Sequence, residues 1–257
     1  MTTTPSRTAR WLYGSLGFLI VLVSWQVAAQ FLFAEGATIP RPGQVFAQLL
    51  RDGWELYGPN IITTGREAAK GWLLGNAVAM LLALVVVQSA TIERFAMRIA
   101  VAAYFLPVVV LAPILAILFT GDWPMVVIAA MTVFFPTLVL LLVGLKTAEA
   151  SSLEVVRCCG GRRLTELRKV RLPASVPSLF TALRLAAPGA VLGAVIGEYG
   201  GAEKGLGVLM INAQQSLEVE RTWGVAIVLA GLVGVAYGAT VLTQRLVAPW
   251  SMESRHV

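Results

Sequence analysis

The feature that most constrains this chain is a series of long apolar blocks separated by short charged breaks. A helix needs about 20 apolar residues to cross the hydrocarbon of a bilayer. Only 13% of the residues are charged, against about 25% in soluble domains. The pattern predicts an all-α, polytopic membrane protein with six transmembrane helices. The predicted spans cover residues 11–33, 71–87, 99–119, 125–145, 179–196 and 223–242.

The charged breaks predict the orientation of the chain. Alternation of six spans places fourteen of the twenty Lys and Arg residues on the side of both termini and six on the other side. Because Lys and Arg accumulate on cytoplasmic loops, we expect a multi-pass plasma-membrane protein with both termini in the cytoplasm. The first block is also compatible with a cleaved signal peptide, but it exceeds the usual apolar length of roughly 7–15 residues.

The composition argues against several functions. The net charge of +6 is not accompanied by the interleaved aromatic and basic residues typical of single-strand nucleic-acid binding. Cys158 and Cys159 are adjacent, so neither a disulfide framework nor a Cys/His metal cluster is expected. No cluster of His, Asp or Glu on facing spans points to a membrane-embedded enzyme.

Prolines and short polar segments predict local irregularities. Pro107, Pro113 and Pro136 lie inside the third and fourth spans, where each removes a backbone donor and is expected to kink the helix. Before the second span, residues 39–43 predict a rigid turn. Residues 45–50 have the spacing of a short amphipathic helix at the membrane interface.

The longest predicted cytoplasmic segment, residues 146–177, has the pattern of two short helices. The first, over residues 149–159, ends at Gly160-Gly161. The second, over residues 164–170, ends at Leu172-Pro173. Apolar positions recur on one face of each helix, with arginines around them. Such a segment fits a protein docking site, or a basic loop lying at anionic lipid headgroups.

The spacing of this loop resembles the Glu-Ala-Ala signature of permeases from ATP-binding-cassette importers. Glu154, Gly160, Val170, Leu172 and Pro173 fall in the register of that signature, although valines replace its paired alanines. Further elements between residues 40 and 250 resemble the nitrate, sulfonate and taurine branch. Permeases for riboflavin and for pyrimidine precursors of thiamine share many of these elements.

This resemblance implies a type I importer permease in the plasma membrane of a prokaryote. It works as a dimer with two cytoplasmic ATPases and an external solute-binding protein. One permease domain is expected over residues 1–257, with a core of about 60–250. No cofactor and no catalytic step are expected here, because the chain lacks the phosphate-binding loop that cradles ATP. The residues implied to contact the ATPase are Glu154, Arg157, Gly160, Leu164, Leu167, Val170, Leu172 and Pro173.

Charged residues near the spans are candidates for the solute path, because burying a charge in a bilayer is costly. Arg66 and Lys70 lie one helical turn apart and either bind an anionic solute or extend to the headgroups. Glu198 and Tyr199 precede a glycine-rich segment with Gly205 and Gly207, which we interpret as a gate or an interfacial turn.

The resemblance favours a small organic anion, such as a sulfonate or a nitrate-like compound, as the imported solute. A pyrimidine or riboflavin is the alternative. The binding protein is expected to dock over residues 35–59 and 198–222. An ion-coupled secondary transporter is the rival of a different class. It often shows inverted repeats and several acidic residues at the membrane midplane.

Overall fold

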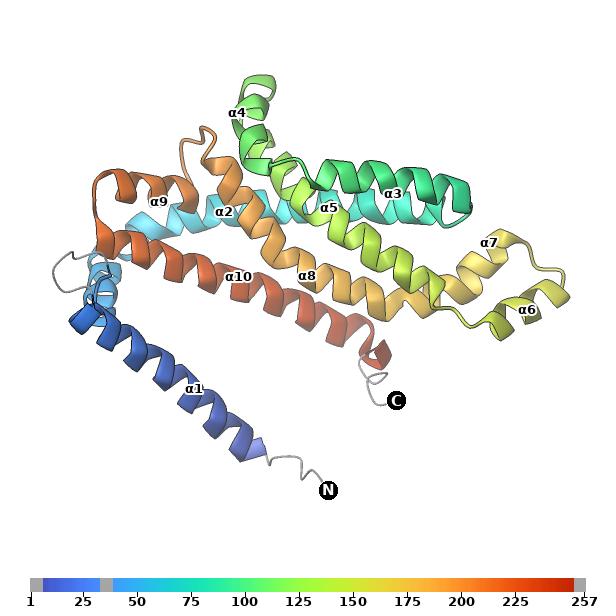
Figure 1. The fold of residues 1–257 in the computed structure, drawn as a ribbon, viewed down its shortest axis with the longest axis horizontal. Helices are drawn as coiled ribbons and strands as arrows, with labels where there is room; N and C mark the ends of the chain where they lie inside the picture. The colour runs from blue at the N-terminus through green and yellow to red at the C-terminus, as the bar shows by residue number, and fades with distance from the viewer. Residues whose placement is uncertain (1–6, 33–38, 252–257) are drawn as a thin grey trace. The chain divides into compact units, whose positions relative to one another are not determined.

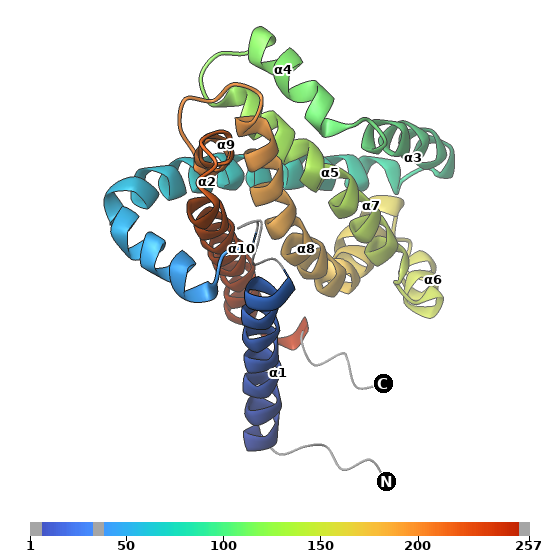
Figure 2. The same ribbon diagram turned by 60° about the vertical axis from the view of Figure 1, so that its left-hand side comes forward.

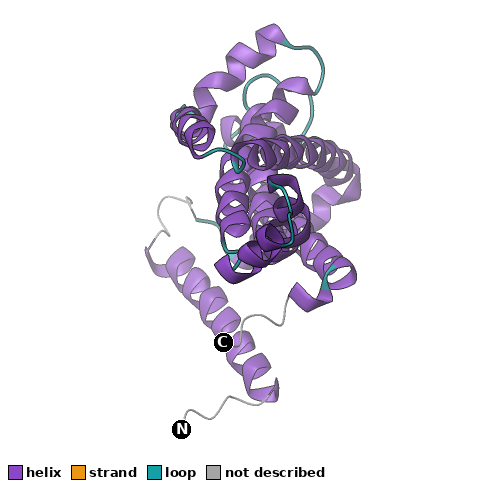
Figure 3. Ribbon diagram, turned by 90° about the vertical axis from the view of Figure 1, so that its right-hand side faces the viewer, coloured by secondary structure: helices purple, strands orange, loops and turns teal. Residues whose placement is uncertain are grey.

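The computed structural model describes residues 7–32 and 39–251, and within these ranges it contains helices and loops but no strand (Figures 1 and 3). Between their end turns, helices pair the backbone donors and acceptors internally, which hydrocarbon requires because it offers no water. The predicted all-α fold is therefore confirmed.

Among the described residues, five helices are long and apolar enough to cross a membrane, and a bent pair of helices makes a sixth candidate. The five long stretches are Tyr13–Phe31, Pro42–Val86, Trp123–Lys146, Arg163–Glu198 and Val219–Val247. The first stretch lies in α1 (Arg7–Val27) and the short π-helix η1 (Ala28–Leu32). The fourth consists of α7 (Arg163–Glu166), the π-helix η2 (Leu167–Arg171) and α8 (Leu172–Glu198). The other three are α2 (Pro42–Val86), α5 (Trp123–Lys146) and α10 (Val219–Val247).

The sixth candidate differs from the continuous third span predicted for residues 99–119. It consists of α3 (Ala90–Tyr104) and α4 (Val108–Leu118), which meet at a bend of 90° (Figure 2). Pro107 precedes α4 in an extended conformation, with φ −67° and ψ 106°. Proline lacks an N–H donor and pushes the residue before it out of the helical region. Pro107 therefore ends a helix, whereas Pro113 and Pro136 lie inside α4 and α5.

The short amphipathic helix predicted for residues 45–50 is not a separate element. It is the first part of α2, which runs as far as Val86. A break within α2 lies at Gly53, where φ is 59° and ψ is −169°. Glycine adopts this conformation readily because it has no Cβ.

The described residues form two compact units. One comprises Met1–Tyr57 and Leu209–Val228, and the other comprises Gly58–Val208 and Leu229–Val257. Helices α2, α9 (Leu206–Gln215) and α10 contribute to both units. The expectation of one permease domain over residues 1–257 stays a prediction.

The second unit is built around the packing of α5 against α8, which lie side by side (Figures 1 and 2). Small residues on α8 allow this approach. A Cβ added at Gly193 would lie 2.7 Å from the Cα of Ala129, and one at Gly197 would lie 2.7 Å from the Cα of Met125. Buried alanines at 186, 190 and 194 continue the same face. Small residues that bring two membrane helices close together maximise their van der Waals contact.

Candidate functional site

The predicted docking loop is a pair of helices that extends from the ends of α5 and α8 (Figure 2). The first, α6 (Ala150–Cys158), has no buried residue. It ends as predicted at Gly160, whose φ is 77°. The N–H of Gly160 donates to the carbonyl of Arg157 at 2.9 Å, and that of Gly161 donates to the carbonyl of Val156 at 2.8 Å. These two bonds form a Schellman motif, in which glycine is favoured because its φ is positive.

Most of the residues proposed to contact the ATPase are accessible on this loop. Glu154, Arg157, Gly160, Leu164 and Pro173 are exposed, and Val170 and Leu172 are half-buried. Leu167 is an exception, because its side chain is buried in the core formed by α2, α3 and α5. The structure therefore gives Leu167 the role of anchoring the loop to the helices.

An ion pair joins the two halves of the loop. Arg157 Nε lies 2.8 Å from Glu166 Oε1, and Nη2 lies 3.4 Å from Oε2. The hydrogen bonds and the charge of Glu166 hold the pKa of Arg157 above its ordinary value. Arg157 thus has a defined partner within the chain.

The second helix of the loop does not end at Leu172-Pro173, as the sequence predicted. Instead α7 continues through η2 into α8, so residues 163–198 are one helical stretch of 36 residues. Pro173 lies in the first turn of α8, immediately after the π-helical turn. A proline is tolerated where the helical hydrogen-bond pattern is already altered.

A second group of candidate residues surrounds the end of α8. Glu198 is only 2% exposed. Its Oε1 accepts a hydrogen bond from Thr64 Oγ1 at 2.5 Å, and its Oε2 accepts one from the N–H of Gly207 at 2.5 Å. Thr64 Oγ1 in turn accepts the N–H of Leu206 at 2.8 Å. The glycine-rich segment predicted as a gate is therefore fastened to α2 and α8.

Both predicted glycines of this segment lie against Glu198. Gly205 has φ 139°, and a Cβ there would collide with the carboxylate of Glu198. A Cβ at Gly207 would lie 2.7 Å from Glu198 Oε2 and 2.8 Å from the carbonyl oxygen of Val195. The side chain of Tyr199 borders the same position. Glycine is needed here for space as well as for conformation.

Glu67 belongs to this group although sequence reasoning did not select it. The side chain is 3% exposed and forms a hydrogen bond with Glu198. Its Oε2 makes no hydrogen bond to any described residue. The signal in the sequence was helical spacing, because Thr64, Glu67, Gly71 and Gly75 share the face of α2 that packs against α5 and α8.

The predicted anion-binding pair, Arg66 and Lys70, lies on the exposed part of the same helix. Lys70 forms an ion pair with Asp122, at the turn before α5. This pairing lowers the pKa of Asp122, with a smaller contribution from the charge of Arg66. Lys70 is thus already neutralised by a carboxylate that the sequence did not assign to it.

A cavity of about 560 Å³ lies beside these residues in the second unit. Its volume falls within the range of roughly 300–1,000 Å³ that small-molecule sites occupy. Acidic groups outnumber basic ones in its lining. The polar and aromatic residues that line it are Thr63, Glu67, Phe119, Thr120, Asp122, Glu203 and Lys204.

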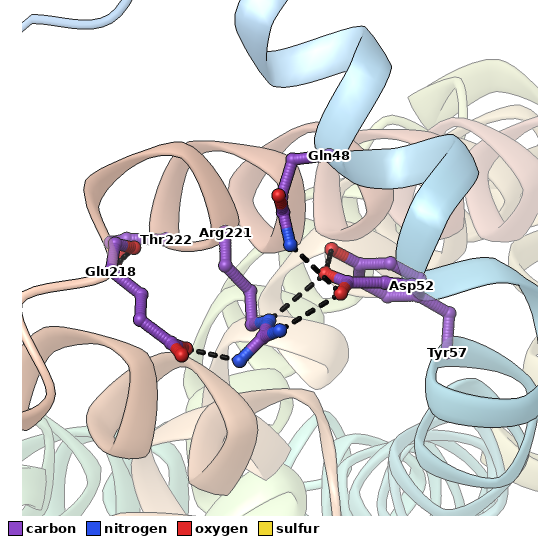
Figure 4. Close-up of polar contacts among 6 residues, drawn as sticks. All are labelled: Gln48, Asp52, Tyr57, Glu218, Arg221 and Thr222. Atoms are coloured by element: carbon purple, nitrogen blue, oxygen red, sulfur yellow. Dashed lines mark hydrogen bonds and ion pairs between the residues drawn. The ribbon is translucent and has the colours of Figure 1, made fainter.

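A further polar cluster, in the first unit, was also missed from the sequence (Figure 4). Arg221 donates through Nε and Nη2 to the two carboxylate oxygens of Asp52, each at 2.9 Å. Gln48 donates to Asp52 at 2.9 Å, and Glu218 forms a second ion pair with Arg221. The cluster joins parts of the two segments proposed to receive the binding protein, of which residues 35–38 lie outside the described part of the chain.

The helical fold, the long apolar spans and the exposed helix pair define a membrane-embedded transport subunit. Residues 75–251 match the family described as the binding-protein-dependent transport system inner membrane component, and the chain belongs to this family. It is thus a permease of the ATP-binding-cassette importer class.

Characterised and inferred relatives differ in the solute that their names specify. The chain is 26% identical over 237 residues to the formylaminopyrimidine transport permease of Halalkalibacterium halodurans, covering 92% of this chain and 94% of the relative. It is 25% identical to a putative aliphatic sulfonates permease of Bacillus subtilis, covering 93% and 88%. It is 27% identical to a riboflavin permease of Chloroflexus aurantiacus, covering 90% and 87%.

Proposed function

We propose that this chain forms the solute pathway of an importer as a dimer, with two ATPase subunits bound at residues 146–177 and an external binding protein. The observation that carries the proposal is the exposed helix pair, whose second helix, α7, continues without interruption into α8. An exposed apolar face on such a rigid element suits a docking partner. ATP hydrolysis belongs to the partner, so this subunit is not an enzyme and holds no cofactor of its own.

In this mechanism the ATPases move α6 and α7 when they bind and hydrolyse ATP. Because α7, η2 and α8 form one helical stretch, the displacement reaches the cluster around Glu198 through helix rather than loop. A shift of packed helices of this kind is a common way to switch between two states. Alternating access then follows from rearrangement of α8 against α2 and α5.

Both termini are proposed to lie in the cytoplasm, with the Glu198 cluster and the Asp52 cluster near the external face. This orientation places the majority of Lys and Arg residues inside, as the positive-inside rule requires. The external binding protein would then dock over the segments around residues 39–59 and 198–222.

Two solute classes follow from the relatives: organic anions and nitrogen heterocycles. The anion hypothesis relied on Arg66 and Lys70, but Lys70 already pairs with Asp122. The adjoining cavity presents Glu67, with an oxygen that makes no hydrogen bond to a described residue. Buried acceptors favour ligands that donate hydrogen bonds. We therefore propose a neutral or cationic heterocycle with N–H donors, such as an aminopyrimidine, over a sulfonate.

Reconstitution into liposomes tests both the importer mechanism and the class of solute. Liposomes containing permease and ATPase should take up solute only with ATP on the ATPase side and with the binding protein on the opposite side. Solute uptake by the permease alone, driven by an ion gradient, would instead support a secondary transporter. Uptake of a labelled aminopyrimidine should be competed by unlabelled pyrimidine and not by an aliphatic sulfonate. Competition by the sulfonate and not by the pyrimidine would instead indicate that the solute is an organic anion.

A further inference from the structure

A second cavity lies where the docking loop meets the turn between α2 and α3. It adjoins the beginning of the helical stretch whose other end is Glu198. Its volume is about 320 Å³, again within the range of small-molecule sites, roughly 300–1,000 Å³. Residues 87–90 of the turn form one wall. The loop side is formed by Arg157, Arg163, Glu166, Leu167 and Arg171.

The charge of this lining is strongly unbalanced. Three guanidinium groups face one carboxylate, Glu166, and that carboxylate is already bound by Arg157. The nearby acid on the first turn of α3, Glu93, pairs with Lys146. The two carboxylates around the cavity therefore each have a partner, and the cavity keeps a net positive charge.

The arginines are positioned by backbone carbonyls and retain most of their donors. Arg163 Nη1 donates to the carbonyl of Gln88 at 3.1 Å, and Arg171 Nη1 donates to that of Leu145 at 3.4 Å. A guanidinium group has five N–H donors in a planar fork. One bond therefore fixes each group in place while other donors stay available, in the geometry that binds phosphate through two parallel bonds.

The opposite wall adds a second, independent preference for an anion. Ser89 precedes α3 in an extended conformation, and its side chain makes no capping hydrogen bond. The N–H groups of Ala90, Thr91 and Ile92 begin a helix of 15 residues and have no acceptor within it. The start of a helix attracts negative charge through these donors and through the helix dipole.

We propose that this cavity binds a phosphate group, held between the arginines of the docking loop and the first turn of α3. Two sources share this chemistry: the headgroup of an anionic lipid and free phosphate in solution. Basic pockets beside membrane helices recruit lipid phosphates in this way. A bound phosphate would bridge the loop and the turn through hydrogen bonds. The position of the docking loop would then depend on the anionic lipid or phosphate that is present.

The test is a binding measurement on the purified full-length permease in a nonionic detergent, at one fixed salt concentration. Calorimetric titrations would use dihexanoyl-phosphatidylglycerol, its zwitterionic phosphatidylcholine counterpart and inorganic phosphate. Binding of phosphatidylglycerol alone assigns the site to a lipid, and binding of inorganic phosphate as well assigns it to any phosphate. Failure of both anions to bind would overturn the proposal.

Substitutions test whether the anion binds in this cavity. The pair Arg163→Gln with Arg171→Gln should weaken anion binding at least tenfold. The matched pair Arg162→Gln with Arg168→Gln removes the same charge from residues that do not line the cavity, and it should stay within threefold of the unmodified chain. Equal losses in both pairs would mean a diffuse electrostatic effect and would contradict a built site.

A second substitution guards against misfolding of the arginine variants. Ser89→Asp keeps a good helix cap while placing a carboxylate where the phosphate would bind, so it should abolish anion binding. Ser89→Asn also caps the helix but carries no charge, and it should preserve binding. If the arginines instead receive an acidic side chain of the ATPase, neither anion binds and Ser89→Asp reduces ATPase co-purification, which would refute the phosphate site.

Discussion

Thr64 donates a hydrogen bond to Glu198 at 2.5 Å although 134 residues separate them in the chain. The same Thr64 hydroxyl accepts the N–H of Leu206 at 2.8 Å. One threonine therefore holds together α2, the end of α8 and the start of α9. Thr64, Glu198 and Leu206 are all buried. If the hydroxyl is removed, water therefore does not replace its two hydrogen bonds.

Thr64→Val should lower the free energy of unfolding by about 2 kcal/mol, because it removes one donor from the buried Glu198 carboxylate and leaves the buried N–H of Leu206 without its acceptor. Thermal unfolding in detergent would measure the change. Thr63→Val is the matched control, since the one hydrogen bond of the Thr63 hydroxyl to a described residue is to the carbonyl of Pro59 one turn away. A loss at position 64 no greater than that at position 63 would contradict the role of Thr64.

Gly205→Ala should be more damaging than Gly201→Ala. Both glycines have positive φ, 139° and 132°, so both substitutions carry a backbone cost of about 1–2 kcal/mol. A Cβ at Gly201 meets no atom of the described chain within 4 Å, whereas one at Gly205 collides with Glu198. Overpacking of this kind adds about 1–3 kcal/mol. Unfolding temperature and transport rate should both rank the two variants in this order.

Gly160→Val should weaken ATPase docking by distorting the end of α6. A β-branched residue at φ 77° costs about 1–2 kcal/mol, while asparagine tolerates this region and should be nearly neutral. A Cβ at this position meets no described atom within 4 Å, so the comparison isolates backbone strain. Co-purification with the ATPase and ATP-driven uptake are the two measurements. Equal values for the valine and asparagine variants would show that ATPase docking does not depend on the conformation of the Schellman motif.

The Asp52–Arg221 pair should show strong coupling in a double-mutant cycle. Asp52→Ala alone leaves a guanidinium group with its main partner missing, and removing one member of a buried pair costs about 3–5 kcal/mol. The Arg221 side chain is 26% exposed, which places the expected loss near 3 kcal/mol. Asp52→Ala combined with Arg221→Ala should be less destabilised than the sum of the single variants. Additive losses would show that the two groups do not depend on each other.

The helical class and most helix positions followed from the sequence because hydrophobic blocks and glycine breaks are local signals. The turn at Gly160 is an example, since a glycine pair after an amphipathic run predicts the left-handed residue found there. The 90° bend at Pro107 was predicted only as a kink. Proline marks an irregularity, but the angle depends on how the neighbouring helices pack.

The long-range charged pairs could not be predicted, because each joins residues far apart in the sequence. Asp52 meets Arg221, and Lys70 meets Asp122, through the tertiary fold alone. Glu67 differs, because it directly follows the exposed Arg66 and only its position around the helix distinguishes it as buried. The helical period, counted from Thr64, would have placed Glu67 on the buried side.

The uninterrupted helix from Arg163 to Glu198 has a mechanical consequence. At 1.5 Å per residue, the helical path along its 36 residues is about 54 Å long. One end of this path meets the docking loop, and the other carries the carboxylate that fastens Gly207. In the proposed mechanism, the helix would transmit axial displacement from the docking loop to Glu198. The one irregular turn within residues 163–198 is η2, where axial motion at the docking-loop end would be absorbed or converted to rotation. The stiffness of its five residues, Leu167–Arg171, would then set how much of that motion reaches the Glu198 cluster.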